Sequence, residues 1–445
     1  MHSHVLYSRY TRTLVSINAM SLTAVLASGF ALRFAVPTLL PHISHSLAAT
    51  PQISTPIDSF RSIREAVYFL QNGMDAYDGG LVHHPPLLVA IFRVLSELLG
   101  PWSEVVFNFL FAAVDVGVAI KLTNMNRWYN QHQSKKTKSQ FTAFSDALVA
   151  SLYLFNPLMV LTNWAHSTQP ISYFLIVELI AQVLVDKNAY RGAISLAVAS
   201  YLSYSPLYLL FPLLALTYMA SGRGSWGREV VVQCSAIFVA SLSMLMLLSF
   251  ALTALQDFVF QCYWPVMLFL KIAPNMGLWW YLFTEMFDFF TPLYKGIFNL
   301  YSFVFIVPLT IRLYEPASLP KIGDSFLAMV LCCLWVSFTK PYPVVGDLGF
   351  ILSMLPIFRN TVIPRTKFLP LTMLMLIVCL LLAPIFYYCW IVLGNGNSNF
   401  FYSMNLVWAG VHVLLFLDLI WGRLVYDYVQ INQVKDTESI RLTQM

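Results

Sequence analysis

Long apolar segments separated by short polar loops run along nearly the whole chain. The first segment extends from Leu14 to about Val36 and follows two arginines, Arg9 and Arg12. It is long enough to cross a hydrocarbon core of roughly 30 Å. Further apolar segments lie near residues 102–120, 146–165, 170–186, 192–205, 206–220, 230–254, 278–311, 324–339, 348–358, 368–393 and 400–421. The pattern predicts an all-α fold, a polytopic transmembrane helical bundle of about 12 spans.

The region between the first two spans has a different pattern. It is rich in Pro, Ser and His until an amphipathic stretch around Phe60 to Leu70. The apolar run from Leu87 to Leu99 is too short to span and contains Arg93 and Glu97, so we expect a re-entrant or interfacial helix. We therefore divide the chain into an amino terminus with the first span (1–36), an outer loop with such helices (37–100), a multi-span bundle (101–426) and a polar tail (427–445).

The basic residues fix an orientation for this bundle. They cluster in short loops, and cytoplasmic loops of membrane proteins carry an excess of Lys and Arg. With the run 87–99 not spanning, the basic loop from Lys121 to Gln140 lies in the cytoplasm, and the later basic loops agree with the same alternation. Both termini are then cytoplasmic. The region 37–100 and the loops near 166–169, 255–290, 340–347 and 394–402 face the other side, where we expect the function.

Composition and charge support the same class. Hydrophobic residues make up 58% of the chain and charged residues only 11%, whereas about a quarter of residues are charged in soluble domains. The net charge of +5 follows from the basic loops, so it indicates topology rather than nucleic-acid binding. The six cysteines show no CxxC spacing, so we expect neither a metal site nor a disulfide framework, and no cofactor.

The stretch from Pro274 to Phe290 differs most from lipid-facing sequence. Pro274 and Gly277 interrupt a helix, three adjacent aromatic residues follow, and Glu285 and Asp288 are spaced to share one helix face. Trp and Tyr prefer the headgroup layer of a membrane. The stretch therefore reads either as an interfacial binding element or as an ordinary aromatic belt with two solvated acids.

Two further outer loops combine amides, carboxylates and aromatic rings. One is Lys340-Pro-Tyr-Pro with Gly346-Asp347, and the other is Gly394-Asn-Gly-Asn-Ser-Asn-Phe-Phe-Tyr402. Amides and carboxylates supply donors and acceptors for sugar hydroxyls, and aromatic faces supply a flat apolar wall. At the mouth of a helical bundle, these groups suit an amphiphile with a glycan head and lipid tails.

Three sequence blocks carry a family resemblance: Pro274-Asn-Met-Gly-Leu-Trp-Trp-Tyr281 with Glu285-Met-Phe, Lys340-Pro-Tyr-Pro with Gly346-Asp347, and Asn397-Ser-Asn-Phe-Phe-Tyr402. In this order, and with the earlier His84-Pro-Pro-Leu87, the chain resembles the phosphatidylinositol-glycan class U (PIG-U) family. That family is a membrane subunit of the glycosylphosphatidylinositol (GPI) transamidase of the endoplasmic reticulum. The resemblance implies a GT-C-like helical subunit without catalytic residues, with a cysteine-protease-like subunit elsewhere performing the transfer.

The resemblance and the residue chemistry together define the candidate site. We expect Asn397 and Asn399 to contact the GPI head, although a polar turn capping the last span explains them equally simply. Asp347 either accepts from glycan groups or caps a helix. Glu285 and Asp288 either bind the lipid glycan or contact a partner subunit. The full set of candidate ligand-binding residues is Asn275, Trp279, Trp280, Glu285, Tyr342, Asp347, Asn397, Asn399 and Phe400.

Enzymatic alternatives rest on fewer residues. Cys262 is the cysteine nearest the outer face, but no histidine is related to it in sequence, so packing is its simpler role. Asp75 and Asp78 in the first outer loop are placed as the acids of a GT-C lipid-linked mannosyltransferase would be, or they are turn residues.

A transporter of the lipid glycan is the third class considered. It would need buried charges along a path through the membrane. The acids within or beside the predicted spans lie close to span ends, where we expect solvation or partner contacts; they are Asp115, Asp146, Glu178 and Asp418.

Overall fold

The computed structural model describes residues 21–137, 141–222, 224–253, 257–316 and 322–432. Helices are the only regular secondary structure in these ranges, as the apolar segments predict. The α-helices are α2 Leu22–Leu39, α3 Pro41–Ala48, α4 Phe60–Gln71, α5 Pro86–Leu99, α6 Ser103–Thr137, α7 Asp146–Leu154, α8 Pro157–Trp164, α9 Gln169–Leu184, α10 Ala189–Leu202, α11 Leu210–Ala220, α12 Gly224–Thr253, α13 Asp257–Cys262, α14 Trp264–Met267, α15 Trp279–Glu285, α16 Thr291–Val304, α17 Ile306–Leu313, α18 Ser325–Thr339, α19 Val345–Met354, α20 Leu369–Tyr387 and α21 Ser398–Asn432.

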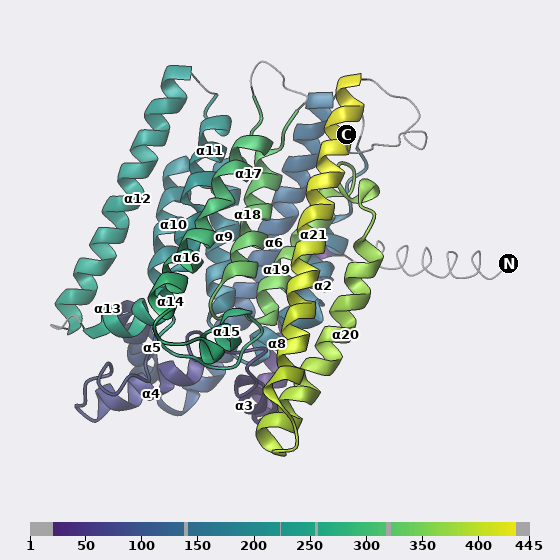
Figure 1. Cartoon of the computed structure of the whole chain (residues 1–445). Coiled ribbons are helices and arrows are strands. Elements are labelled where there is room, and N and C mark those ends of the chain that lie inside the picture. The colour runs from purple at the N-terminus through teal and green to yellow at the C-terminus, as the bar shows by residue number, and fades with distance from the viewer. Residues whose placement is uncertain (1–20, 138–140, 223, 254–256, 317–321, 433–445) are drawn as a thin grey trace.

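The long helices run side by side, and short helices gather at one end of the bundle (Figure 1). α12 forms one edge, and the α20–α21 pair forms the opposite edge and projects beyond its neighbours. α18 lies in the interior, where nearly every residue from Ser325 to Thr339 is buried. The end that carries α3, α4, α5, α13 and α15 is called the short-helix end below. It holds the loops that the basic-residue pattern assigns to the outer side.

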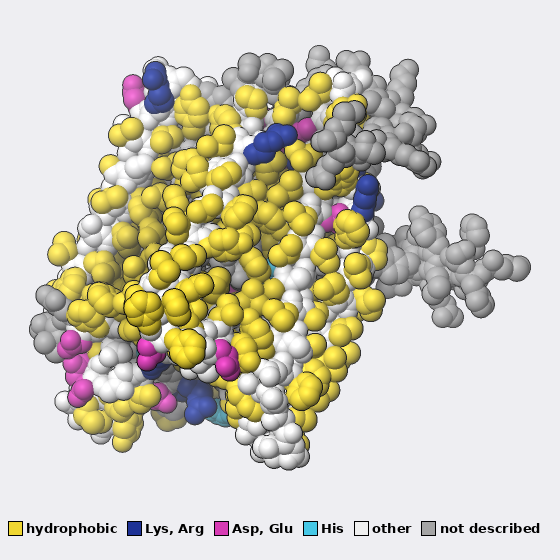
Figure 2. All heavy atoms as spheres, in the orientation of Figure 1, with side chains coloured by type: hydrophobic (Ala, Val, Ile, Leu, Met, Phe, Trp, Pro, Cys, Tyr) yellow, Lys and Arg dark blue, Asp and Glu magenta, His cyan; other side chains and the backbone are white. Residues whose placement is uncertain are grey.

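The chain is a membrane protein by the length and composition of its helices. Six helical segments in the described residues are long and apolar enough to cross a membrane, or up to seven if the bent α7–α8 pair counts as one span. The outer helices expose large hydrophobic side chains such as Leu247 and Leu381, and these cover the visible surface (Figure 2). Such a surface suits contact with lipid rather than with water.

Several predicted segments have a different internal structure. The region 278–311 divides into α15, α16 and α17, and its apolar spanning segment is Thr291–Leu313, as expected for a crossing after Pro292. The predicted amphipathic and interfacial segments form α4 and α5 at the short-helix end. α21 continues to Asn432, into the predicted polar tail; the remainder of the tail and the first 20 residues lie outside the described ranges.

The expectation that Asp115 lies at a solvated span end was wrong. Asp115 is fully buried, and its carboxylate lies 2.5 Å from Nε of the equally buried Arg33. Tyr153 donates to the same carboxylate at 2.7 Å and Asn163 at 3.0 Å. The cluster joins α2, α6, α7 and α8, and its charges are paired and hydrogen-bonded as burial in an apolar interior requires.

The other three acids have internal partners as well. Asp418 is buried, and its carboxylate accepts from the backbone N–H groups of Lys367 and Phe368, where α20 begins. Glu178 lies 2.8 Å from Lys121, and Asp146 at the start of α7 pairs with Arg127. The prediction that Asp418 is solvated was therefore wrong. Each of the four acids is accounted for by a contact within the chain.

Candidate functional site

The three sequence blocks that carry the family resemblance meet at the short-helix end. The side-chain amide of Asn405 in α21 donates to the backbone carbonyls of Asn275 at 2.7 Å and Gly277 at 2.9 Å. The amide of Asn275 donates in turn to the carbonyl of Pro341 at 3.3 Å. Segments separated by 66 and 130 residues are thereby joined through buried amides.

Gly277 permits this close approach. A β-carbon at Gly277 would lie 2.8 Å from the side-chain oxygen of Asn275 and 2.9 Å from the ring of Pro343. The backbone N–H of Gly277 also donates to that Asn275 oxygen at 2.6 Å. Because a larger residue would have to displace Asn275 or the ring of Pro343, Gly277 allows the two blocks to approach this closely.

An aromatic cluster covers the junction of α15, α20 and α21. The ring of Trp280 is buried and stacks on Trp390 with centroids 5.9 Å apart. It also packs against Phe401 at 5.9 Å and Tyr402 at 6.0 Å. Tyr281 stacks on Tyr402 at 4.3 Å. Both tyrosines are partly exposed, so the edge of the cluster presents an aromatic wall beside the loop 394–397.

The amides of that loop lie on the surface at the edge of the wall. The side-chain oxygen of Asn397 accepts from the backbone N–H of Asn399 at 2.8 Å, which caps the start of α21. Asn399 accepts a hydrogen bond from the hydroxyl of Tyr281. Both amides are exposed, and Phe400 beside them is 58% exposed. Asn397 therefore caps α21, and the amides of Asn397 and Asn399 are still accessible to a ligand.

Three of the predicted site residues are used inside the protein. Asn275 belongs to the junction described above. The hydroxyl of the buried Tyr342 donates to the carbonyl of Lys271 at 2.5 Å, and its ring stacks on Phe269. The side chains of Asn275 and Tyr342 are buried and support the site from inside the protein.

Asp347 is the third of these internal residues. Its carboxylate lies 3.1 Å from Nζ of Lys340 and accepts from the hydroxyl of Tyr173 at 2.9 Å. It also accepts from the backbone N–H of Val344, which caps α19. Val344 is the N-cap residue, so Asp347 acts from the first turn of α19 rather than as the N-cap itself, and its carboxylate is buried.

The remaining predicted residues lie around α15. Trp279 packs edge-on against Phe298, with centroids 4.1 Å apart. Glu285, at the end of α15, and Asp288 are exposed. The structure thus brings Asn397, Asn399 and Phe400 to one surface, with Trp280 buried in the aromatic cluster beside them and Glu285 on the same short-helix end.

Sequence reasoning missed several residues that build this site. Trp390 and Tyr402 complete the aromatic wall, and Asn405 ties the blocks together. An uncharged polar residue inside an apolar segment was the available signal for Asn405, because a buried amide needs hydrogen-bond partners. Lys340 is the cation that neutralises Asp347, and its place in the same short loop was a comparable signal.

The candidate catalytic residues are poorly placed for chemistry. Cys262 is buried, and burial raises the pKa of its thiol well above the usual value, so the nucleophilic thiolate is disfavoured. The fold does bring His83 close by, with Nδ1 at 2.6 Å from the carbonyl of Gln261, and burial lowers the pKa of His83 to about 4. No hydrogen bond joins Cys262 to His83 in the described residues.

The acids of the first outer loop form a turn. The side-chain oxygen of Asp75 accepts from the backbone N–H of Tyr77 at 3.0 Å, and Asp78 is exposed before two glycines with positive φ. This is the conformational role that Asp and Gly commonly have in turns.

Comparison with known proteins identifies the same family that the three blocks indicate. The profile of the family described as "GPI transamidase subunit PIG-U" matches residues 27–408. The chain is 34% identical over 400 residues to a "GPI transamidase component GAB1" from Saccharomyces cerevisiae, covering 89% of this chain and 93% of that protein. It is 30% identical to a GAB1 homologue from Schizosaccharomyces pombe (85% and 87% covered). It is 28% identical to the human "GPI-anchor transamidase component PIGU" (85% and 88% covered). The chain therefore belongs to the PIG-U family of GPI transamidase subunits.

Proposed function

We propose that this chain is a non-catalytic membrane subunit of a GPI transamidase that holds the GPI lipid glycan while a protein is attached to it. The proposal rests on family membership and on one structural observation. The first and third blocks meet at a surface where the exposed amides of Asn397 and Asn399 border an aromatic wall, and the second block lies buried beneath them, joined through Asn275. Amides beside aromatic faces are suited to sugar hydroxyls.

The surroundings of this surface match an amphiphilic ligand. α20 exposes Leu381 and Ile385, and the helical turn Tyr388–Val392, which leads on to the loop 394–397, exposes Tyr388. Lipid tails would lie against this apolar face while the glycan head lies beside the amides. Phe400 and the tyrosine pair would form the apolar wall. Asn275, Trp279, Trp280, Tyr342 and Asp347 would support it from within, and Glu285 would contact the glycan or a partner subunit.

The chemistry of transfer is assigned to another subunit. Acyl transfer by a cysteine enzyme needs a thiolate activated by a histidine. The raised pKa of Cys262 and the occupied ring nitrogen of His83 disfavour such a pair in this chain. The relatives from yeast and human are each named as a component of the transamidase. The expected partners are the other subunits, including a catalytic cysteine-protease-like subunit, together with the GPI lipid.

The proposal also includes the number of membrane spans and the orientation of the chain in the endoplasmic reticulum membrane. The bent α7–α8 pair, α10 and the shorter apolar helices Gln169–Leu184, Ser205–Ala220, Ser325–Thr339 and Val345–Phe358 would cross the membrane together with the longer ones, giving about 12 spans in a GT-C-like arrangement. The short-helix end would face the lumen of the endoplasmic reticulum, and both termini the cytoplasm. The exposed amides would then lie on the side where the glycan of the lipid is presented.

Photocrosslinking of a GPI glycolipid to the assembled complex tests this function. A diazirine-bearing GPI should label wild-type protein near the loop 394–397. The double variant Asn397→Ala/Asn399→Ala should lose most of the labelling, whereas Asn72→Ala, an exposed amide at the same end of the molecule, should retain it. Equal labelling of all three proteins would reject the proposed binding surface.

A further inference from the structure

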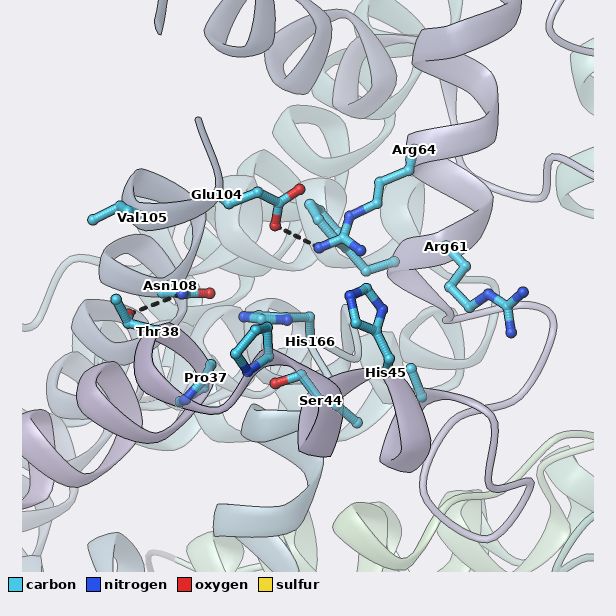
Figure 3. Close-up of a pocket in the computed structure, with 14 residues that line it drawn as sticks. Pro37, Thr38, Ser44, His45, Arg61, Arg64, Glu104, Val105, Asn108 and His166 are labelled. Carbon is cyan, nitrogen blue, oxygen red and sulfur yellow. Dashed lines mark hydrogen bonds and ion pairs between the residues drawn. The ribbon is translucent and has the colours of Figure 1, made fainter. Parts of the chain in front are cut away.

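A cavity lies at the short-helix end, apart from the surface formed by Asn397 and Asn399 (the amide surface). It has a volume of about 390 Å³ and is enclosed by the end of α2, by α3 and α4, by the start of α6 and by the turn after α8 (Figure 3). None of the predicted site residues lines it. Its polar lining consists of Thr38, Ser44, His45, Arg61, Arg64, Glu104, Asn108 and His166.

Positive charge dominates this lining. Nη2 of Arg64 lies 2.5 Å from the carboxylate of Glu104, and the guanidinium of Arg64 lies over the ring of Phe60. Arg61 is exposed at the rim and makes no ion pair within the described ranges. The lining thus carries two guanidinium groups and one carboxylate, and the charge of Arg61 has no ion-pair partner among the described residues. Guanidinium groups bind phosphate oxygens through paired hydrogen bonds.

Buried polar atoms at the cavity lack partners. The side-chain oxygen of Asn108, Nε2 of His166 and the hydroxyl of Ser44 are buried and have no hydrogen-bond partner among the described residues. Asn108 uses its amide nitrogen on Thr38, so its oxygen points to the open centre (Figure 3). Buried polar groups are nearly always hydrogen-bonded in native proteins, so these three groups are available to a hydrogen-bonding ligand that enters the cavity.

His166 has the character of a neutral hydrogen-bonding group. Its ring packs against Phe60 and Phe111, with centroids 5.8 and 5.0 Å away. Burial, with the nearby Arg64 and His45, lowers the pKa of His166 to about 3. The imidazole is therefore uncharged near neutral pH, and it offers a hydrogen bond without adding a fixed charge.

Exposed apolar residues lie within two positions of the cavity-lining Thr38, Glu104 and Asn108. Leu39 at the end of the first described span is 75% exposed, Trp102 is 70% exposed and Phe109 is 50% exposed. Trp is characteristic of the membrane–water boundary. A ligand entering here would have its charged group in the cavity and its apolar part along α2 and α6.

We propose that this cavity binds the phosphodiester group of a membrane phospholipid. Arg61 and Arg64 would hold the phosphate oxygens, and Asn108, Ser44 and His166 would bind the rest of the headgroup. Lipid and free phosphate share this chemistry, but the apolar rim favours the lipid. The site is distinct from the surface of Asn397 and Asn399, so its test is independent of the proposed function.

Native mass spectrometry of the delipidated full-length chain in detergent tests the proposal. Short-chain phosphatidylglycerol, diacylglycerol of the same chain length and inorganic phosphate are the probes. Phosphatidylglycerol should bind, and diacylglycerol should bind far more weakly. Arg61→Gln should weaken phosphatidylglycerol binding about fivefold, as expected for one partly exposed charge contact. Glu104→Gln should strengthen it, because it removes the competing carboxylate.

Arg93→Gln is the matched control, since Arg93 lies on α5 at the same end and pairs only with Glu97 in the described residues. It should leave binding unchanged. Equal effects of Arg61→Gln and Arg93→Gln, or equal binding of diacylglycerol and phosphatidylglycerol, would overturn the proposal. Saturation of the cavity by inorganic phosphate at the concentration at which the lipid binds would assign the site to a free anion and overturn the lipid assignment.

Discussion

At the residue scale, the amides of this chain divide into two groups. Asn275 and Asn405 are buried and hold backbone carbonyls, while Asn397 and Asn399 are exposed at the end of α21. The first group fixes the positions of chain segments, and the second is available to a ligand. Substitutions in the two groups should consequently change different properties of the protein.

Asn405→Leu should destabilise the folded protein. It removes the donor to two buried carbonyls, and leaving such groups unpaired costs about 1–3 kcal/mol each. A thermal unfolding midpoint measured by fluorescence-detected size-exclusion chromatography should fall. Asn399→Ala should leave the midpoint almost unchanged, and an equal fall for both variants would contradict the division.

The aromatic residues of the site allow a second comparison, between the buried Trp280 and the exposed Phe400. Trp280→Ala should cost about 3–5 kcal/mol, the usual range for removing a buried large aromatic ring, because Trp280 contacts four other rings of the cluster. Phe400→Ala removes a ring that is 58% exposed and should change stability by less than about 0.5 kcal/mol. The same chromatographic midpoint checks both values, and a large loss for Phe400→Ala would show that the ring is packed against the protein.

The buried charges are a further residue-scale feature. Asp115→Leu leaves Arg33 buried without its partner and should cost about 3–5 kcal/mol. Adding Arg33→Met removes the unpaired charge, so the double variant should recover part of the loss. The yield of monodisperse protein after purification is the measure of this recovery. A lower yield for the double variant than for Asp115→Leu alone would show that the ion pair is not the main interaction at this site.

At the element scale, α20, α15 and α21 form the part of the fold that carries the proposed ligand surface. α15 is short and depends on the preceding segment, which is fixed by Gly277 and the Pro-rich turn before α19. Helices this short have little intrinsic stability and depend on tertiary packing. The junction of the blocks is therefore required for the aromatic wall to exist.

Gly277→Ala should loosen α15 without unfolding the bundle. The added β-carbon would lie within 3.0 Å of Asn275 and Pro343, so one of them must move. Hydrogen–deuterium exchange should rise in residues 274–290 and remain unchanged in α18. As a control, Gly296→Ala places a β-carbon in open space and should leave exchange as in the wild type. Unchanged exchange in Gly277→Ala would argue against the junction.

Much of the element structure follows from the sequence. Apolar segments predicted the helices, and the parity of basic loops predicted which loops share one end, because hydrophobicity and charge act locally along the chain. The side-chain partners did not follow. Arg33 pairs with a residue 82 positions away, and Tyr173 reaches Asp347 across 174 positions. Such contacts depend on helix packing, which periodicity alone does not specify.

At the scale of the whole molecule, the two ends differ in chemistry. The short-helix end carries the amide surface and the phospholipid cavity, and the opposite end carries the basic loops. Cysteines introduced one at a time test this orientation, in a background with Cys389→Ser because the other five native cysteines are buried. Asn395→Cys should react with a membrane-impermeant maleimide only from the lumenal side, and Arg312→Cys only from the cytoplasmic side. Labelling of both positions from the same side would reject the proposed topology.

Restoration of GPI-anchored surface proteins in cells that lack their own PIG-U subunit tests the central claim most directly. Wild-type protein should restore surface display, and so should Asp75→Ala/Asp78→Ala, since those acids lie in a turn. Asn397→Ala/Asn399→Ala should assemble with the other subunits and fail to restore display. Full restoration by the asparagine variant, or failure of the aspartate variant alone with accumulation of mannose-deficient GPI precursors, would contradict a lipid-holding subunit and favour a mannosyltransferase.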